Sequence, residues 1–215
     1  MKLLLTAFDP FGGAEINPAQ KAAEAVRAPA GVKIVRLLVP TVFRTAAQTV
    51  NQAIDREKPD AVLCVGQAGG RDAVTPERVA INLMDAAAAD NAGQMPVDQP
   101  VIEGGENALF VTLPAKAMAE AIRQAGIPAR VSCSAGTFVC NSLLYGVLYH
   151  CRQSRNAVRA GFIHLPFLPE QTAGRPELPA MPLEQMVRAL EIAIEVIDRH
   201  LKAENGGINH GICQA

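Results

Sequence analysis

Short apolar and β-branched runs alternate with longer segments of helical periodicity along most of the chain. The apolar runs predict strands at 2–8, 33–39, 61–65 and 160–165, with weaker candidates at 78–83, 109–113 and 129–132. The helical patterns predict helices at 18–27, 42–57, 115–125, 138–151 and 183–203. This alternation predicts the α/β class: a three-layer α/β/α sandwich with a mostly parallel twisted sheet and helices on both faces.

The sequence indicates one domain. It shows neither an internal repeat nor a linker, and 215 residues are enough to bury a large core. We expect the domain to span 1–205 and a flexible C-terminal tail to span 206–215, because Asn205, Gly206 and Gly207 favour the end of the last helix. Two further segments, 84–108 and the proline-rich 166–182, are predicted loops.

Charge and cysteine content narrow the classes of function. The net charge is -1, and no basic stripe with interleaved aromatic residues occurs, so we expect no nucleic-acid partner. The first apolar run stops at Asp9-Pro10, short of an export signal, and no run is long enough to span a membrane. The five cysteines are irregularly spaced without a CxxC pair, so we expect free thiols in the cytoplasm, with no metal and no cofactor.

Cys140 is the candidate nucleophile. It follows the turn-like stretch 134–137 and opens a predicted helix, where amide N–H groups and the macrodipole are expected to lower the thiol pKa. The same amides could hold an oxyanion. The alternative is a small buried hydrophobic residue, which most free cysteines are. Cys133 is the serious rival, whereas the other cysteines fall in a predicted core strand, a helix C-terminus and the tail: Cys64, Cys151 and Cys213.

His164 is the candidate base, because it ends a predicted strand, and ligands gather at strand ends in α/β sheets. An imidazole can take the thiol proton and return it to a leaving amine near neutral pH. Glu77 is a candidate for fixing the orientation of that imidazole. A surface ion pair between Glu77 and Arg78 is the plain alternative, and Asp72 and Asp85 are rivals for the same role.

Six stretches with unusual residues occur in a fixed order over nearly the whole chain. They are Phe8-Asp9-Pro10-Phe11-Gly12-Gly13 with Asn17-Pro18, Gly66-Gln67-Ala68-Gly69-Gly70-Arg71, Glu77-Arg78-Val79-Ala80-Ile81-Asn82, Asp90-Asn91, Ser134-Ala135-Gly136-Thr137-Phe138-Val139-Cys140-Asn141 and Phe162-Ile163-His164-Leu165-Pro166-Phe167-Leu168-Pro169. Each alone is weak evidence, but together they resemble the pyroglutamyl-peptidase I family, also called pyrrolidone carboxyl peptidase.

The resemblance implies a phosphorylase/hydrolase-like fold and a hydrolytic domain. The implied activity is that of a cysteine exopeptidase, an omega peptidase, that releases N-terminal pyroglutamate from peptides through a thioester intermediate. The implied catalytic triad is Glu77, Cys140 and His164. The resemblance also implies a cytoplasmic homotetramer that needs no cofactor.

The resemblance also implies a pocket for the flat lactam ring of pyroglutamate. Phe8, Phe11 and Phe138 would form its apolar walls, where aromatic faces supply dispersion and burial. Asn17 and the backbone of Gln67 would hydrogen-bond the ring amide, and unpaired polar groups would reject analogues. Two further pocket neighbours are implied: Val139 and Thr45.

One segment departs from the family pattern. Where the family reads Asp-Ala-Arg-Ile-Pro-Asp-Asn, this chain has Ala87, Ala88 and Ala89 in place of the central triplet. We predict that the loss weakens or loosens one wall of the substrate site without abolishing activity.

Other classes of function stay open at this point. The loop 66–71 could serve a phosphorylase or nucleotide-binding enzyme, although it is neither a Walker A nor a GxGxxG pattern. A nucleophile elbow would need glycines two residues before and after Cys140, where Phe138 and Ser142 stand. A non-catalytic small-molecule binding protein of the same fold is the remaining alternative.

Overall fold

Strands β1 (Lys2–Phe8) and β3 (Ala61–Gln67) form the middle of the sheet, because nearly all their residues are apolar and buried. The computed structural model describes residues 1–154 and 158–208 of the protein. Strands β2 (Lys33–Val39) and β7 (Arg159–Leu165) extend this parallel core, and β4 (Thr75–Pro76) pairs antiparallel with β7. The resulting order of the five strands is β2-β1-β3-β7-β4.

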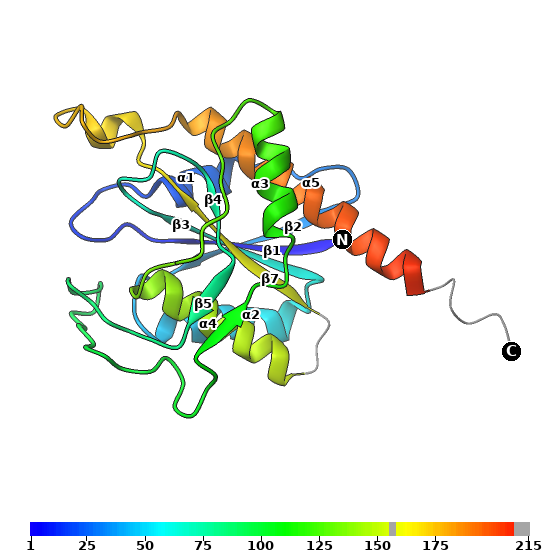
Figure 1. Cartoon of the computed structure of the whole chain (residues 1–215), viewed down its shortest axis with the longest axis horizontal. Helices are drawn as coiled ribbons and strands as arrows, with labels where there is room; N and C mark the ends of the chain where they lie inside the picture. The colour runs from blue at the N-terminus through cyan, green and yellow to red at the C-terminus, as the bar shows by residue number, and fades with distance from the viewer. Residues whose placement is uncertain (155–157, 209–215) are drawn as a thin grey trace, which may run out of the picture.

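Helices cover both faces of this sheet (Figure 1). On one face α1 (Pro18–Ala25) and α3 (Ala115–Gln124) pack against α5 (Leu183–Ile208). On the other face α2 (Thr45–Glu57) packs against α4 (Val139–Gln153). The predicted three-layer sandwich with a mostly parallel sheet is therefore confirmed.

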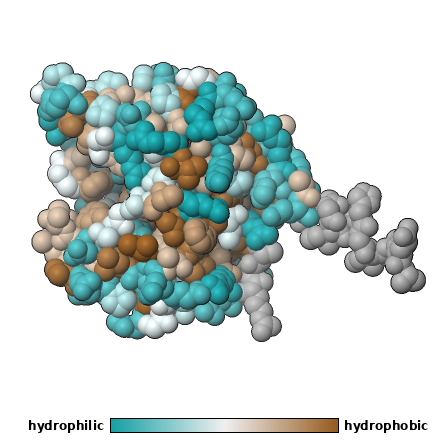
Figure 2. Space-filling model, viewed as in Figure 1, coloured by the Kyte–Doolittle hydropathy of each residue, from teal (hydrophilic) through white to brown (hydrophobic). Residues whose placement is uncertain are grey.

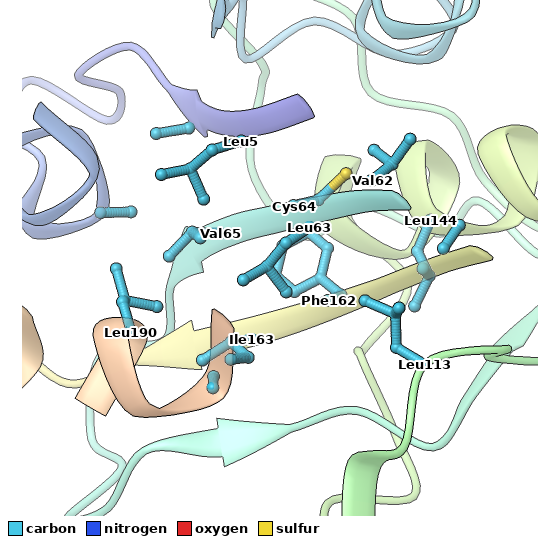
Figure 3. Packing of buried hydrophobic residues seen from close by; sticks show 14 of the residues in the cluster. Leu5, Val62, Leu63, Cys64, Val65, Leu113, Leu144, Phe162, Ile163 and Leu190 are labelled. Atoms are coloured by element: carbon cyan, nitrogen blue, oxygen red, sulfur yellow. The ribbon is translucent and has the colours of Figure 1, made fainter. Parts of the chain in front are cut away.

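The core lies on both sides of the sheet because side chains alternate along each central strand. In Figure 3, Val62 and Cys64 of β3 point away from Leu63 and Val65 of the same strand. Leu144 of α4 and Leu190 of α5 reach the sheet from opposite layers, and both are fully buried. This packing fixes β3 and β7, whose ends carry the functional residues described below.

A second, two-stranded sheet of β5 (Val79–Ile81) and β6 (Ala108–Phe110) flanks the long segment 84–108. Met84 and Gln99 exchange two backbone hydrogen bonds across that segment, 2.7 and 3.0 Å long. Among the described residues, the exposed large hydrophobic side chains are Leu38, Met95, Val97 and Phe110. Figure 2 shows such apolar areas as separate brown patches within a largely hydrophilic face.

Several predicted boundaries were wrong. The candidate strand 129–132 contributes only isolated bridges, Val74–Ala129 and Glu77–Ser132, and the short strand β4 was not predicted. Helix α5 continues through Gly206 and Gly207 to Ile208, because glycine permits a helix end without requiring one. The rest of the expected tail, 209–215, lies outside the described residues. A short 3₁₀ helix, η1 (Pro169–Thr172), interrupts the predicted loop 166–182.

Candidate active site

The carboxyl ends of β1, β3 and β7 meet at one edge of the sheet, because the three strands are parallel and adjacent. The register places Gly66 of β3 beside His164 of β7. The antiparallel strand β4 places Thr75 on the other side of His164. The segment that follows β4 therefore runs back along β7 from its carboxyl end and carries Glu77 beside Phe162.

Glu77 and His164 form a buried hydrogen-bonded pair. Oε1 of Glu77 lies 2.7 Å from Nδ1 of His164, and the two side chains are 0% and 4% exposed. The backbone N–H of Glu77 donates to the carbonyl of Phe162 at 2.9 Å, which anchors the glutamate to β7. The structure therefore places the candidate orienting residue Glu77 against the candidate base His164.

Arg71 also donates to Oε1 of Glu77, at 2.6 Å. Burial opposes ionisation of Glu77, but its hydrogen bonds with His164 and Arg71 outweigh that effect, so the carboxyl pKa lies below its usual range. Burial lowers the pKa of His164, the Glu77 carboxylate opposes that effect, and the Arg71 charge adds to it, so the net pKa is lowered. The imidazole is thus neutral at neutral pH and able to accept a proton.

Cys140 occupies the first turn of α4, directly after Val139. Its Sγ lies against Gly66, since a Cβ built on that glycine would stand 3.1 Å from Sγ and 2.7 Å from the ring of Phe162. The Phe162 ring in turn lies 4.6 Å from the imidazole of His164. The thiol and the imidazole therefore lie on the same face of the sheet, although no hydrogen bond joins them within the described residues.

The predicted lowering of the Cys140 pKa was wrong. Burial raises the pKa of the thiol to about 12, the Glu77 carboxylate adds to the rise, and the Arg71 charge opposes it. Desolvation at this packed site outweighs the helix N-terminus, which offers only partial charges. Cys140 is consequently a neutral thiol in the free protein, and its ionisation requires a base.

The rival residues lie elsewhere. Arg78 stacks over the ring of Phe110 at 5.2 Å instead of pairing with Glu77, and Asp72 pairs with Arg130 on the surface. The other described cysteines divide into an exposed one, Cys133, and two buried ones, Cys64 and Cys151. The site thus combines one partly buried cysteine, one buried imidazole and one buried carboxylate.

Three aromatic rings cluster at the start of α4. Phe138 lies 6.2 Å from Phe11 and 5.2 Å from Phe43, the latter edge-on. Phe8, the third wall residue implied by the resemblance, contacts Phe162 at 6.4 Å. Phe43, which precedes α2 and is 1% exposed, was not predicted from the sequence as part of this cluster. In the sequence, Phe43 is a large aromatic residue near the start of a predicted helix. Such a position also fits ordinary core packing.

Comparisons with known proteins decide the family. The model of the pyroglutamyl peptidase family matches residues 1–200. The pyrrolidone-carboxylate peptidase of Levilactobacillus brevis is 54% identical over 198 residues, which cover 92% of this chain and 97% of that protein. The chain belongs to the pyroglutamyl peptidase family.

Solved structures agree with this assignment. Pyroglutamyl peptidase I of Bacillus amyloliquefaciens is 44% identical with a TM-score of 0.87, covering 91% of this chain and 94% of that one. A mutant pyrrolidone carboxyl peptidase of Pyrococcus furiosus is 36% identical with a TM-score of 0.88, covering 94% and 100% of the two chains. The predicted enzyme class, a cysteine-type pyroglutamyl peptidase, is confirmed at the level of the family.

The polar residues expected to bind the substrate already have hydrogen-bond partners within the protein. Asn17 is the N-cap of α1: its Oδ1 accepts from Ala19 N–H at 2.9 Å, and its Nδ2 donates to the Asp9 carbonyl at 3.0 Å. The side-chain Oε1 of Gln67 accepts from Nε2 of Gln171 at 3.0 Å. The backbone of Gln67 lies at the end of β3. Both residues lie at the edge of the sheet that holds His164.

The two remaining pocket residues differ in burial. Val139 is fully buried in the core at the start of α4. Thr45 is exposed in the first turn of α2, and its carbonyl accepts the hydroxyl of Thr49 at 2.8 Å. The structure brings Val139 next to Cys140 along the chain. The backbone N–H of Thr45 donates to the carbonyl of Phe43, a member of the aromatic cluster, at 2.6 Å.

The segment in which this chain departs from the pyroglutamyl peptidase pattern is anchored on both sides. The Ala86 N–H donates to the Pro96 carbonyl at 2.9 Å, and Oδ2 of Asp90 accepts the Phe43 N–H at 2.8 Å. The three alanines between these anchors, Ala87, Ala88 and Ala89, are exposed. The segment therefore lies near the aromatic cluster through Asp90, but presents only methyl groups there.

Two further observations bear on cofactors and membranes. Within the described ranges 1–154 and 158–208, no three His, Cys, Asp or Glu side chains are placed to hold a metal ion. No described helix has the length and apolar character needed to cross a membrane.

Proposed function

We propose that this protein is a cysteine exopeptidase that releases N-terminal pyroglutamate from peptides, with Cys140 as nucleophile, His164 as acid–base and Glu77 as orienting carboxylate. The observation that carries the proposal is the buried Glu77–His164 hydrogen bond of 2.7 Å, on the same face of the sheet as the Cys140 thiol. Family membership supplies the substrate class, because relatives are named pyrrolidone-carboxylate peptidases.

The first half of the reaction forms a thioester. The Cys140 sulfur attacks the pyroglutamyl carbonyl while its proton passes to Nε2 of His164, and Glu77 stabilises the imidazolium that results. The amide C–N bond then breaks, and His164 returns the proton to the departing amine. Because burial raises the pKa of the thiol, we expect this proton transfer to accompany attack.

The second half consumes one water molecule. His164 takes a proton from water as the water oxygen attacks the thioester carbonyl. The C–S bond then breaks, and His164 returns the proton to the departing sulfur, which releases pyroglutamate and restores the thiol. Amide N–H groups in the first turn of α4 are available for the oxyanion of both steps, since Cys140 lies in that turn. The reaction uses no metal and no cofactor.

We assign the aromatic cluster to the lactam ring. Phe11 and Phe138 provide apolar faces beside Cys140, and Phe8 lies at the end of β1 with Asn17 and Gln67 near the same edge. Val139 and Thr45 complete the assigned pocket. Pyroglutamate carries no charge on its blocked nitrogen, so its pocket needs no buried carboxylate to hold an ammonium group. We also propose that the protein acts on peptides in the cytoplasm and that it assembles as a homotetramer. Light scattering measures the assembly.

The decisive experiment compares hydrolysis of a pyroglutamyl chromogenic amide by wild type, Cys140→Ala and Cys133→Ala. We expect turnover by wild type and Cys133→Ala and none above background by Cys140→Ala. The prolyl amide, which lacks the lactam carbonyl, is expected to be a poor substrate for wild type. Equal release by wild type and Cys140→Ala would remove the thiol from the mechanism.

The phosphorylase alternative has a separate readout. Arg71, the basic residue of the glycine-rich loop 66–71, is already paired with Glu77 at 2.6 Å. We therefore expect turnover to be independent of added phosphate, and a requirement for phosphate would favour that alternative.

A further inference from the structure

Arg71 contacts two segments of the chain around the site, one containing Thr75 and Glu77 and the other containing Ser134. Its Nη1 donates to Oγ1 of Thr75 in β4 and to Oε1 of Glu77, the latter at 2.6 Å. Its Nη2 donates to the carbonyl of Ser134 at 3.0 Å. The side chain is 23% exposed, so most of the guanidinium is enclosed by these partners. A planar group with several fixed donors suits such a three-way contact.

These two segments carry or adjoin the three residues assigned to the reaction. Glu77 is held directly, and Thr75 stands in register with His164 while its hydroxyl lies 3.4 Å from the His164 carbonyl. Ser134 begins the loop that leads into α4 and Cys140. We propose that Arg71 is a positioning residue that holds Glu77, the strand beside His164 and the loop before Cys140 in one arrangement. This inference rests on the proposed function.

The charge of Arg71 has a second effect, because Arg71 and His164 share one carboxylate oxygen. Oε1 of Glu77 accepts from both, whereas Oε2 is buried and has no hydrogen-bond partner in the described part of the chain. The guanidinium thus competes with the imidazole for the negative charge of Glu77. The charged and titratable groups around His164 are Glu77 after β4, Arg71 after β3 and Cys140 on α4.

The sign of this effect follows from those charges. After burial, which is the largest influence on His164, Glu77 raises the imidazole pKa and Arg71 lowers it. Removal of Arg71 therefore leaves the Glu77 charge less compensated and raises the His164 pKa. An imidazole with a higher pKa is protonated over more of the neutral range, where it cannot accept the thiol proton.

Three variants separate the positioning role of the Arg71 side chain from the effect of its charge. Arg71→Met removes both, and Arg71→Lys keeps the charge but loses the planar fork. Arg130→Met is the matched control, because Arg130 lines the same hollow as Arg71 but pairs with the exposed Asp72. With a pyroglutamyl amide, we expect Arg71→Met to lower kcat about 10- to 100-fold, since small misplacements of reacting groups are that costly.

The kinetic pattern identifies a positioning role. KM is expected to stay within about twofold, because Arg71 touches no group assigned to the lactam pocket. Arg71→Lys is expected to fall between wild type and Arg71→Met, and Arg130→Met is expected to match wild type. Full activity of Arg71→Met, or of Arg71→Lys, would overturn the proposed three-way hold. If Arg71→Met does not fold, the Arg71→Lys result decides.

A measurement without substrate distinguishes this inference from the proposed function. Nitrogen-15 NMR of the histidine rings reports the pKa of His164, with the signal assigned by its loss in His164→Gln. We expect this pKa to rise in Arg71→Met and to stay near the wild-type value in Arg71→Lys and Arg130→Met. An unchanged pKa in Arg71→Met would refute the charge effect, even if wild type proved inactive toward pyroglutamyl amides.

Discussion

Nδ1 of His164 lies 2.7 Å from Oε1 of Glu77, and neither side chain is open to solvent. A carboxylate at Nδ1 holds the proton on that nitrogen and leaves Nε2 with a lone pair. His150 makes a similar contact with Asp55, at 2.9 Å, but those side chains are 25% and 58% exposed. Water screens the second pair, so only the first can fix an imidazole for proton transfer.

Glu77→Gln is expected to lower kcat by about 100-fold or more, because the imidazolium formed during attack loses its counter-charge. The amide oxygen of glutamine can still accept from both His164 and Arg71, so the ring orientation is expected to persist. The measurement is kcat and KM on a pyroglutamyl amide, with Asp72→Asn as the surface control. Wild-type kcat in Glu77→Gln would contradict the orienting role.

Cys140 is expected to stay protonated throughout the neutral range. Its pKa is raised from 9.0 to about 12, and a thiol with a raised pKa retains its proton until the pH approaches that value. The ultraviolet difference spectrum of wild type minus Cys140→Ser should therefore show no thiolate step between about pH 5 and 9. A step in that range would mean that a thiolate–imidazolium pair is already formed in the free protein.

Gly66 is expected to be intolerant of any side chain. A Cβ there would stand 2.7 Å from the Phe162 ring and 3.1 Å from Cys140 Sγ, so one of them must move. We expect Gly66→Ala to cost about 1–3 kcal/mol of unfolding free energy, as overpacking does, and to reduce kcat. Gly174→Ala is the control, because nothing lies within 4 Å of its added Cβ. Chemical denaturation and turnover of both variants test the contrast.

The sequence predicted the main strands because their residues are apolar on both faces. The predicted bounds of β1 and β2 agree with the structure residue for residue, and β7 begins one residue earlier than expected. Strand β4 was missed because two residues, one of them Pro76, give no periodic signal, and its pairing depends on the neighbouring β7.

The types of residue in the candidate site could be predicted from the sequence, but the electrostatic interactions between them could not. His164 could be chosen because it ends an apolar strand, and the resemblance supported Glu77 and Cys140. The shared contact of Arg71 and His164 with one oxygen of Glu77 depends on tertiary placement, which no local pattern encodes. Burial of Cys140 likewise depends on β3 and Phe162. Its position at a helix start therefore predicted a pKa shift in the wrong direction.

Phe43 is expected to support the lactam pocket through Phe138. Its ring meets Phe138 edge-on at 5.2 Å, and it is almost fully buried. Phe43→Ala should cost about 3–5 kcal/mol of unfolding free energy through the cavity it leaves, and Phe43→Leu should cost less. With either variant, KM for the pyroglutamyl amide is expected to rise more than kcat falls. The control is Phe110→Ala, because Phe110 is 67% exposed; an unchanged KM in Phe43→Leu would separate this ring from the pocket.

The alanine triplet offers a gain-of-function test of the substrate wall. Ala87, Ala88 and Ala89 are exposed between two anchored residues, so larger side chains can be introduced there without displacing the core. We expect the triple change Ala87→Arg, Ala88→Ile and Ala89→Pro to raise kcat/KM about tenfold, the effect of one added charged hydrogen bond. The double change Ala88→Ile and Ala89→Pro separates the guanidinium from the apolar part. If kcat/KM stays the same in both variants, the triplet has no part in the substrate wall.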